Sequence, residues 1–196
     1  MLIYIRHSDD QTSDTTHEHD PKLNQEGKNR AAKEGRSLIK EFGIPTIIYC
    51  SPYRRTRETV KYMLRNVSRR DKAGIRIVFN SRLARYFAKV ERRNVNICDS
   101  TRDSDIPIYE SRKEFIERVE KLAKRMEHYI DSDEIVWCIT HTTVYKRLGR
   151  IYDIPLPSYI PHMDNFVTPK LRDVPAEPQR TSNKKKKCEH CGQIHG

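Results

Sequence analysis

Short apolar runs divide the chain and predict buried β-strands. Three of them, residues 2–5, 47–50 and 135–139, are continuous and too short for a typical helix. A further strand is expected over 75–79, where apolar and mostly polar residues alternate. The alternating apolar residues of that segment are Ile75, Ile77 and Phe79. Residues 166–167 predict a last short strand.

Segments with helical periodicity lie between these strands. The first helix is expected to start after Asn24, a favourable N-cap residue, and to stop at Gly43. A continuous apolar stripe predicts another helix over 111–130. Two more helices are expected after 51–52 and around Val144. Strands that alternate with helices predict a three-layer α/β/α sandwich with a mostly parallel central sheet.

Basic residues and histidines follow several of the predicted strands directly. Arg6 and His7 follow the first strand, Arg55 follows the second, and His141 comes after the strand that ends near 139. The carboxyl ends of parallel strands meet at one edge of the sheet, where open α/β folds bind ligands. The sequence therefore predicts a functional site at this edge.

These residue types fit phosphoryl transfer without a metal or another cofactor. Such a reaction needs a nucleophile, cations for the phosphoryl oxygens and a proton for the leaving oxygen. Neutral imidazole is a nucleophile that is present at physiological pH. Arginine carries a permanent charge and a fork of donors that matches phosphate.

Four motifs, in order along the chain, resemble the histidine phosphatase superfamily, which includes the cofactor-dependent phosphoglycerate mutases. The family's Arg-His-Gly corresponds to Arg6-His7-Ser8, and its Leu-Thr-x-x-Gly to residues 23–27. Its Ser-Pro-x-x-Arg-Ala-x-x-Thr corresponds to residues 51–59, and its Thr-His-Gly-Gly to residues 140–143. Each motif alone is weak, but the four together are specific.

The resemblance implies a role for each matching residue. His7 would become phosphorylated, Arg6 and Arg55 would clamp the phosphoryl oxygens, and His141 would donate a hydrogen bond to them. The implied activity is phosphomonoester hydrolysis through a phosphohistidine, on a phosphorylated small molecule or a phosphoprotein. Arg54 is expected to point away from the site, because neighbours on a helix do not share a face.

The chain departs from the family pattern beside both histidines and at the general acid. Ser8 replaces a glycine, and we expect its hydroxyl at the phosphate; two threonines replace the glycines after His141. The family often has Arg-Leu-x-Glu after the third strand, and its glutamate is the acid. This chain has Arg85 at that position. We assign Glu91 as the acid, with Asp9 and Asp10 as alternatives. The remaining histidines are not assigned to the site, although His162 precedes the last predicted strand and could line the pocket.

Composition favours anionic partners. The net charge is +11, and residues 170–196 hold seven basic and three acidic side chains, which is +4 of that total. We expect a catalytic domain over 1–170 and a basic, flexible tail over 171–196, which lacks apolar periodicity. Lys184 to Lys187 could contact a polyanion or serve in nuclear targeting.

The tail also contains soft metal ligands. Cys188, Cys191 and His195 have zinc-like spacing, but a full ribbon needs a second pair of ligands. We therefore assign no metal site, although another chain could complete one. The five cysteines are an odd number, which favours reduced thiols. With no signal peptide and no apolar run of about 20 residues, a cytoplasmic or nuclear protein without membrane insertion is expected.

Two alternative functions remain open. A mutase of the phosphoglycerate mutase type could return the phosphoryl group from His7 to its product. A phosphate-binding or interaction module could have lost turnover, because Arg85 occupies the position of the acid. The fate of the phosphoryl group separates these alternatives from hydrolysis.

Overall fold

The computed structural model describes residues 1–10, 20–86 and 110–169. The described residues form a five-stranded sheet with the order β3-β2-β4-β1-β5. The strands are β1 (Leu2–Arg6), β2 (Ile47–Cys50), β3 (Arg76–Phe79), β4 (Val136–Thr140) and β5 (Asn165–Val167). Only β5 runs antiparallel to its neighbour, so the prediction of a mostly parallel sheet is confirmed.

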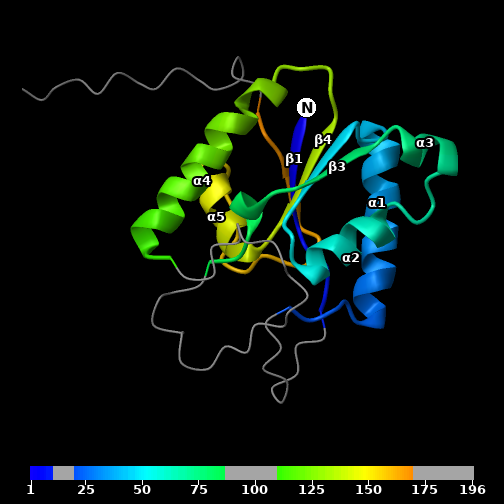
Figure 1. Cartoon of the computed structure of the whole chain (residues 1–196), viewed down its shortest axis with the longest axis horizontal. Helices are drawn as coiled ribbons and strands as arrows, with labels where there is room; N and C mark the ends of the chain where they lie inside the picture. The colour runs from blue at the N-terminus through cyan, green and yellow to red at the C-terminus, as the bar shows by residue number, and fades with distance from the viewer. Residues whose placement is uncertain (11–19, 87–109, 170–196) are drawn as a thin grey trace, which may run out of the picture.

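The predicted helices are present on both faces of the sheet (Figure 1). They are α1 (Gln25–Phe42), α2 (Arg54–Met63), α4 (Arg112–Met126) and α5 (Thr142–Ile151), and the 3₁₀ turn η3 (Glu127–Tyr129) ends the helical segment of α4. The short helix α3 (Arg69–Ala73) and the 3₁₀ turn η1 (Ser81–Leu83) are not predicted from the sequence. Asn24 caps α1, since its Oδ1 accepts a hydrogen bond from the Gly27 amide at 2.6 Å. Ser111 and Glu114 form a capping box at the start of α4.

Alternate side chains of β1 supply the two halves of the core. Leu2 and Tyr4 pack in a cluster with α4 and α5, while Ile3 and Ile5 pack in a second cluster with α1 and α2. All four side chains are fully buried. A strand that is buried on both faces requires a helical layer on each side, so the three-layer sandwich is confirmed.

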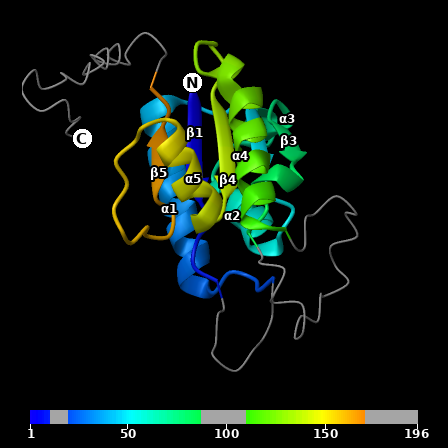
Figure 2. The ribbon, with the colours of Figure 1, turned by 90° about the vertical axis from the view of Figure 1, so that its left-hand side faces the viewer.

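The sheet topology brings four strand ends to one edge. The carboxyl ends of β1, β2, β3 and β4 point the same way, because these strands are parallel. β5 lies beside β1 and runs antiparallel to it, so its amino end reaches the same edge (Figure 2). Side chains that follow β1, β2 and β4, or that precede β5, therefore lie close together.

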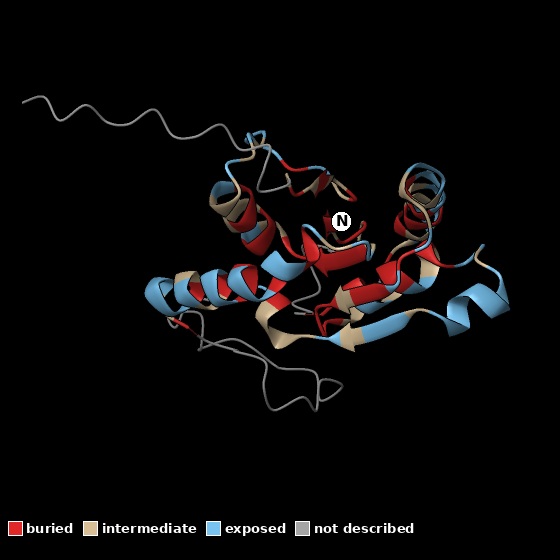
Figure 3. Ribbon diagram, turned by 90° about the horizontal axis from the view of Figure 1, so that it is seen from above, coloured by how far each residue is buried: buried red, intermediate tan, exposed pale blue. Residues whose placement is uncertain are grey.

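The strand at β3 is predicted correctly, but of its three alternating apolar residues only Ile75 packs against the core. Ile77 and Phe79 are 44% and 53% exposed, while Val78 packs against the core. β3 is an edge strand (Figure 3), and α1 and α2 pack over the centre of the sheet rather than over this edge. An apolar alternation at an edge thus identifies the strand without identifying its buried face.

Several expectations fall outside the described residues. They concern Glu91, the tail 171–196 and its metal-ligand candidates Cys188, Cys191 and His195. Within 1–10, 20–86 and 110–169, no helix is long and apolar enough to cross a membrane.

The close approach of α1 and α2 depends on Gly35. A Cβ atom at this position would lie 2.3 Å from the Met63 carbonyl oxygen and 2.6 Å from the Met63 Cα. Both neighbours are backbone atoms, which cannot rotate away as a side chain can. A substitution must therefore separate the two helices that cover one face of the sheet.

We predict that Gly35→Ala lowers the free energy of unfolding by about 1–3 kcal/mol, the usual cost of overpacking. The loss outweighs the gain of about 1 kcal/mol in helix propensity that alanine brings. Ser37→Ala is the matched control, because Ser37 is exposed on the same helix. Urea unfolding measures both variants. A Gly35→Ala protein as stable as the control would show that the helices are not in this contact.

Candidate active site

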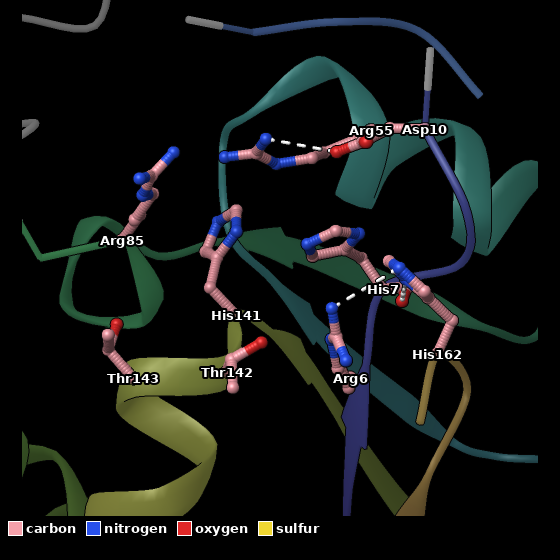
Figure 4. A pocket seen from close by; sticks show the side chains of 9 residues that line it. All are labelled: Arg6, His7, Asp10, Arg55, Arg85, His141, Thr142, Thr143 and His162. Atoms are coloured by element: carbon pink, nitrogen blue, oxygen red, sulfur yellow. Dashed lines mark hydrogen bonds and ion pairs between the residues drawn. The ribbon is translucent and has the colours of Figure 1, made fainter. Parts of the chain in front are cut away.

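A cavity of about 290 Å³ lies at the edge where the strand ends meet. Its walls come from the segments after β1, β2 and β4, the segment after η1 and the loop before β5 (Figure 4). The lining residues are Arg6, His7, Asp10, Arg55, Arg85, His141, Thr142, Thr143 and His162. The structure thus brings together four residues that the sequence assigns to one site: Arg6, His7, Arg55 and His141.

The amide and the ring of His7 each form a hydrogen bond that holds it at the end of β1. Its amide donates to the Thr140 carbonyl at 2.9 Å, which continues the pairing of β1 with β4. Its Nδ1 lies 2.8 Å from the Ser8 carbonyl oxygen. A carbonyl oxygen can only accept, so Nδ1 carries the proton and Nε2 of the neutral ring keeps a lone pair.

The surroundings of His7 favour this neutral form. The side chain is buried, and burial lowers the pKa of His7 well below its usual 6.5 because the charged ring would lose its hydration. The positive charge of Arg55 lowers this pKa further. His7 is therefore a neutral imidazole at neutral pH, with its proton on Nδ1 and a nucleophilic Nε2.

His141 stands beside His7 at the end of β4. The ring centroids are 5.2 Å apart, and His141 Nε2 lies 2.9 Å from the Ser51 hydroxyl. Burial, followed by the charge of Arg55, lowers the pKa of His141 well below 6.5. His141 Nδ1 is buried and has no hydrogen-bond partner among the described residues. A ligand in the cavity could supply that partner.

Arg55 faces the cavity from the first turn of α2, whereas Arg54 does not. The Arg55 side chain is 5% exposed and forms an ion pair with Asp10 at 3.1 Å. The Arg54 side chain is 44% exposed, and its Nε lies 3.4 Å from a Glu58 carboxylate oxygen. The two arginines occupy different faces of the helix, as their spacing predicts.

His162 lines the cavity, a position that the sequence suggests but does not assign. Its Nε2 accepts a hydrogen bond from an Arg6 guanidinium nitrogen at 3.2 Å. Its Nδ1, which carries the proton in the neutral ring, donates to the His7 carbonyl at 3.2 Å. His162 thus connects Arg6 to His7.

The backbone next to His162 explains why its place in the site could not be assigned from the sequence. Met163 is buried and has φ +64°, a left-handed conformation that is rare for a bulky residue. The Asp164 carbonyl accepts the Arg6 amide at 2.9 Å, which fastens this loop to the end of β1. His162 precedes its strand, and it reaches the site only because β5 is antiparallel. The antiparallel direction of β5 could have placed His162 in the site only if the strand pairing were known.

Ser8 does not lie where we expect it. Its hydroxyl is fully buried and donates to the Gly27 carbonyl at 2.8 Å, and Ser8 is not among the cavity residues. Its amide donates to the Thr59 hydroxyl at 3.0 Å. The expectation that the Ser8 hydroxyl contacts the phosphate is therefore wrong. The Ser8 side chain points towards α1, and only the backbone carbonyl of Ser8 accepts a hydrogen bond from His7.

Buried donors without partners surround the cavity. Within the described part of the chain, six buried side-chain atoms make no hydrogen bond, and three of them, Arg6 Nε, Arg55 Nε and His141 Nδ1, belong to residues of this cavity. Buried polar groups in native proteins are almost always satisfied, so three such atoms in one wall favour a ligand-binding site. Since arginine nitrogens can only donate, that ligand must accept hydrogen bonds. An anion with several oxygens meets this requirement.

The candidate acids lie at different places. Arg85 lines the cavity at the position of the family's glutamate, and Asp10 is a carboxylate in the same wall. Asp9 instead pairs with Arg30 of α1 at 3.0 Å. Glu91 is outside the described residues. Among the described residues, no group of three or more His, Cys, Asp or Glu side chains could hold a metal ion.

Solved structures share this fold. YhfR of Bacillus stearothermophilus is 20% identical, with a TM-score of 0.59 over 84% of this chain and 88% of that chain. The ecdysone phosphate phosphatase of Bombyx mori, in complex with tungstate, is 14% identical, with a TM-score of 0.58 over 84% and 86%. A mycobacterial glucosyl-3-phosphoglycerate phosphatase is 16% identical, with a TM-score of 0.56 over 84% and 87%.

Sequence comparison gives one family and no individual relative. None of the curated proteins compared matches the chain. The family model of the histidine phosphatase superfamily (branch 1) matches residues 2–165, a span that contains β1 to β4, the first residue of β5 and all nine residues of the cavity wall. The chain belongs to the histidine phosphatase superfamily.

Proposed function

We propose that this protein hydrolyses phosphomonoesters through a phosphohistidine on His7, without a metal ion. The observation that carries the proposal is the hydrogen bond from His7 Nδ1 to the Ser8 carbonyl. It fixes the tautomer whose Nε2 can attack phosphorus, in a cavity whose other donors lack partners. The superfamily consists of phosphatases and mutases, and two structural neighbours are named as phosphatases, which supports phosphate-ester chemistry.

In the first step, His7 Nε2 attacks phosphorus, and the bond between phosphorus and the ester oxygen breaks. Arg6, Arg55 and His141 donate to the three phosphoryl oxygens, so their charge is stabilised as the bond to the leaving oxygen lengthens. The Ser51 hydroxyl lies 2.9 Å from His141 Nε2, and when it donates there the His141 proton sits on Nδ1, ready for a phosphoryl oxygen.

The leaving oxygen requires a proton, and two carboxylates are candidates. Asp10 lines the cavity, and its carboxylate pairs with Arg55 at 3.1 Å, so it lies beside an arginine that would bind the phosphoryl group. Glu91 remains the sequence-based candidate. The protonated acid would give its proton to the leaving alcohol.

In the second step, water attacks the phosphohistidine. The phosphorus–nitrogen bond breaks, inorganic phosphate leaves, and His7 Nε2 regains its lone pair. The carboxylate left by the first step accepts a proton from this water, which restores the acid. A mutase would instead return the phosphoryl group to a bound product, so the amount of free phosphate per turnover separates the two reactions.

We predict that His7→Ala lowers kcat for an aryl phosphate by at least about 10³-fold, as expected when a nucleophile is removed. The matched control is His128→Ala, because His128 is exposed and lies outside the cavity. Release of phosphate is measured for both variants, with circular dichroism to compare their folds. An active His7→Ala enzyme would rule out His7 as the nucleophile.

We predict that Arg55→Lys lowers kcat/KM by about 10²-fold, while Arg54→Lys changes it by about threefold or less. Lysine keeps the charge beside Asp10 but loses the forked donors that bind two oxygens. The measurement is steady-state hydrolysis of an aryl phosphate. Similar losses in both variants would mean that the buried arginine has no special contact with the phosphoryl group.

The acid can be identified from the leaving group. We predict that Asp10→Asn lowers the rate on an alkyl phosphate about 10²-fold or more and spares an aryl phosphate, whose phenoxide needs little protonation. Glu91→Gln is tested in parallel, and the ratio of the two rates is compared with that of the wild type. If the ratio changes only for Glu91→Gln, the acid is Glu91. If neither variant changes it, neither carboxylate is the acid.

A further inference from the structure

The cavity has a third arginine that the phosphoryl group does not require. Arg85 lines the wall beside Thr142 and Thr143, and Figure 4 shows it across His141 from Arg6 and His162. Arg6, Arg55 and His141 already offer buried donors for the phosphoryl oxygens. Unlike the buried Arg55, Arg85 is exposed and therefore lies at the rim.

Arg85 is held by a well-anchored segment. The Leu83 carbonyl accepts the Thr140 hydroxyl at 2.8 Å, which ties η1 to the end of β4. The Tyr86 amide donates to the Thr143 hydroxyl at 3.4 Å, which ties the residue after Arg85 to the first turn of α5. Arg85 is therefore fixed between two elements that also position His141.

The amino end of α5 adds positive potential to this side of the cavity. α5 has ten residues, and its N-cap residue, His141, forms no side-chain cap. Its first amides therefore lack the side-chain acceptor that most helices provide, and the helix dipole favours an anion there. His141 Nδ1 is the donor for a phosphoryl oxygen, so the second site depends on Arg85, which lines the same wall, together with this helix end.

An arginine cannot do the work of the carboxylic acid whose position it takes. Guanidinium keeps its protons at any physiological pH, so Arg85 cannot protonate a leaving alkoxide. It can, however, bind negative charge on the leaving group. In-line attack by His7 puts the leaving group on the far side of phosphorus, and Arg85 lies across His141 from His7 (Figure 4). An arginine there suits a substrate whose leaving group is itself anionic.

We infer that Arg85, with the amino end of α5, binds a second anionic group carried by the leaving group. The substrate is then a phosphate ester or anhydride with a carboxylate or a second phosphate close to the bond that breaks. The identification of this ligand as a substrate rests on the proposed function, but the binding site itself does not require turnover.

Binding of inert phosphonates tests the site without catalysis. Phosphonoacetate carries the second charge, and phosphonoacetamide is nearly the same shape without it. Dissociation constants for both are measured by calorimetry on the full chain in EDTA, for wild type, Arg85→Gln and Arg82→Gln. Arg82 is the matched control, since it lies in the same segment but does not line the cavity. The ratio of the two dissociation constants is compared between proteins, so the different acidities of the two phosphonates cancel.

We expect Arg85→Gln to lower the preference for phosphonoacetate over phosphonoacetamide by about tenfold, the lower end of what a charged hydrogen bond contributes, because Arg85 is exposed. Arg82→Gln should keep the wild-type preference. The same measurement with 3-phosphonopropionate and its amide tests a second charge one carbon further from phosphorus. Binding of methylenediphosphonate shows whether the second anionic group can be a phosphate as well as a carboxylate.

Equal preferences in the Arg85→Gln and Arg82→Gln proteins, at both ligand lengths and with methylenediphosphonate, would overturn the inference. Failure of the proposed function would look different. In that case the wild type would hydrolyse no phosphate ester, while the ratio of dissociation constants would still decide whether Arg85 binds a second anion.

Discussion

The hydrogen bond from His7 Nδ1 to the Ser8 carbonyl is the interaction on which the proposed chemistry depends. Without it, the ring could place its proton on Nε2 and would have no lone pair to offer the cavity. The bond is possible because the pairing of β1 with β4 fixes the His7 backbone and because Ser8 is tied to α1 and α2. Strand pairing, helix packing and nucleophile geometry are thus parts of one arrangement.

Burial gives this site its reactivity at a cost in stability. His7 and His141 are kept neutral by loss of hydration, and the same loss makes unpartnered donors on Arg6 and Arg55 expensive. The ion pair of Arg55 with Asp10 offsets part of this cost while no ligand is bound. A bound anion would satisfy the remaining donors, so we expect anion binding to stabilise the fold.

The sequence predicts most of the fold because its strands are short apolar runs and its helices have clear caps and stripes. It also predicts Arg6, His7, Arg55 and His141 together, since each follows a parallel strand and parallel strands end at one edge.

Other features depend on geometry that no local pattern contains. The sequence leaves the place of His162 open, because its entry into the site depends on an antiparallel strand and a left-handed Met163. The Ser8 hydroxyl is drawn to a carbonyl of α1, and the alternation in β3 cannot show which face of an edge strand lacks a helix. These are consequences of how distant segments meet, so they become visible only in the folded structure.

The phosphoryl group itself provides the clearest test of the central claim. The full-length enzyme is mixed with an isotopically labelled aryl phosphate, quenched in alkali within the first turnover, and digested for mass spectrometry and phosphorus NMR. The account predicts a label that is stable in alkali, labile in acid and attached to Nε2 of His7. A label on another residue, or hydrolysis that inverts a chiral phosphate because water attacks directly, would contradict it.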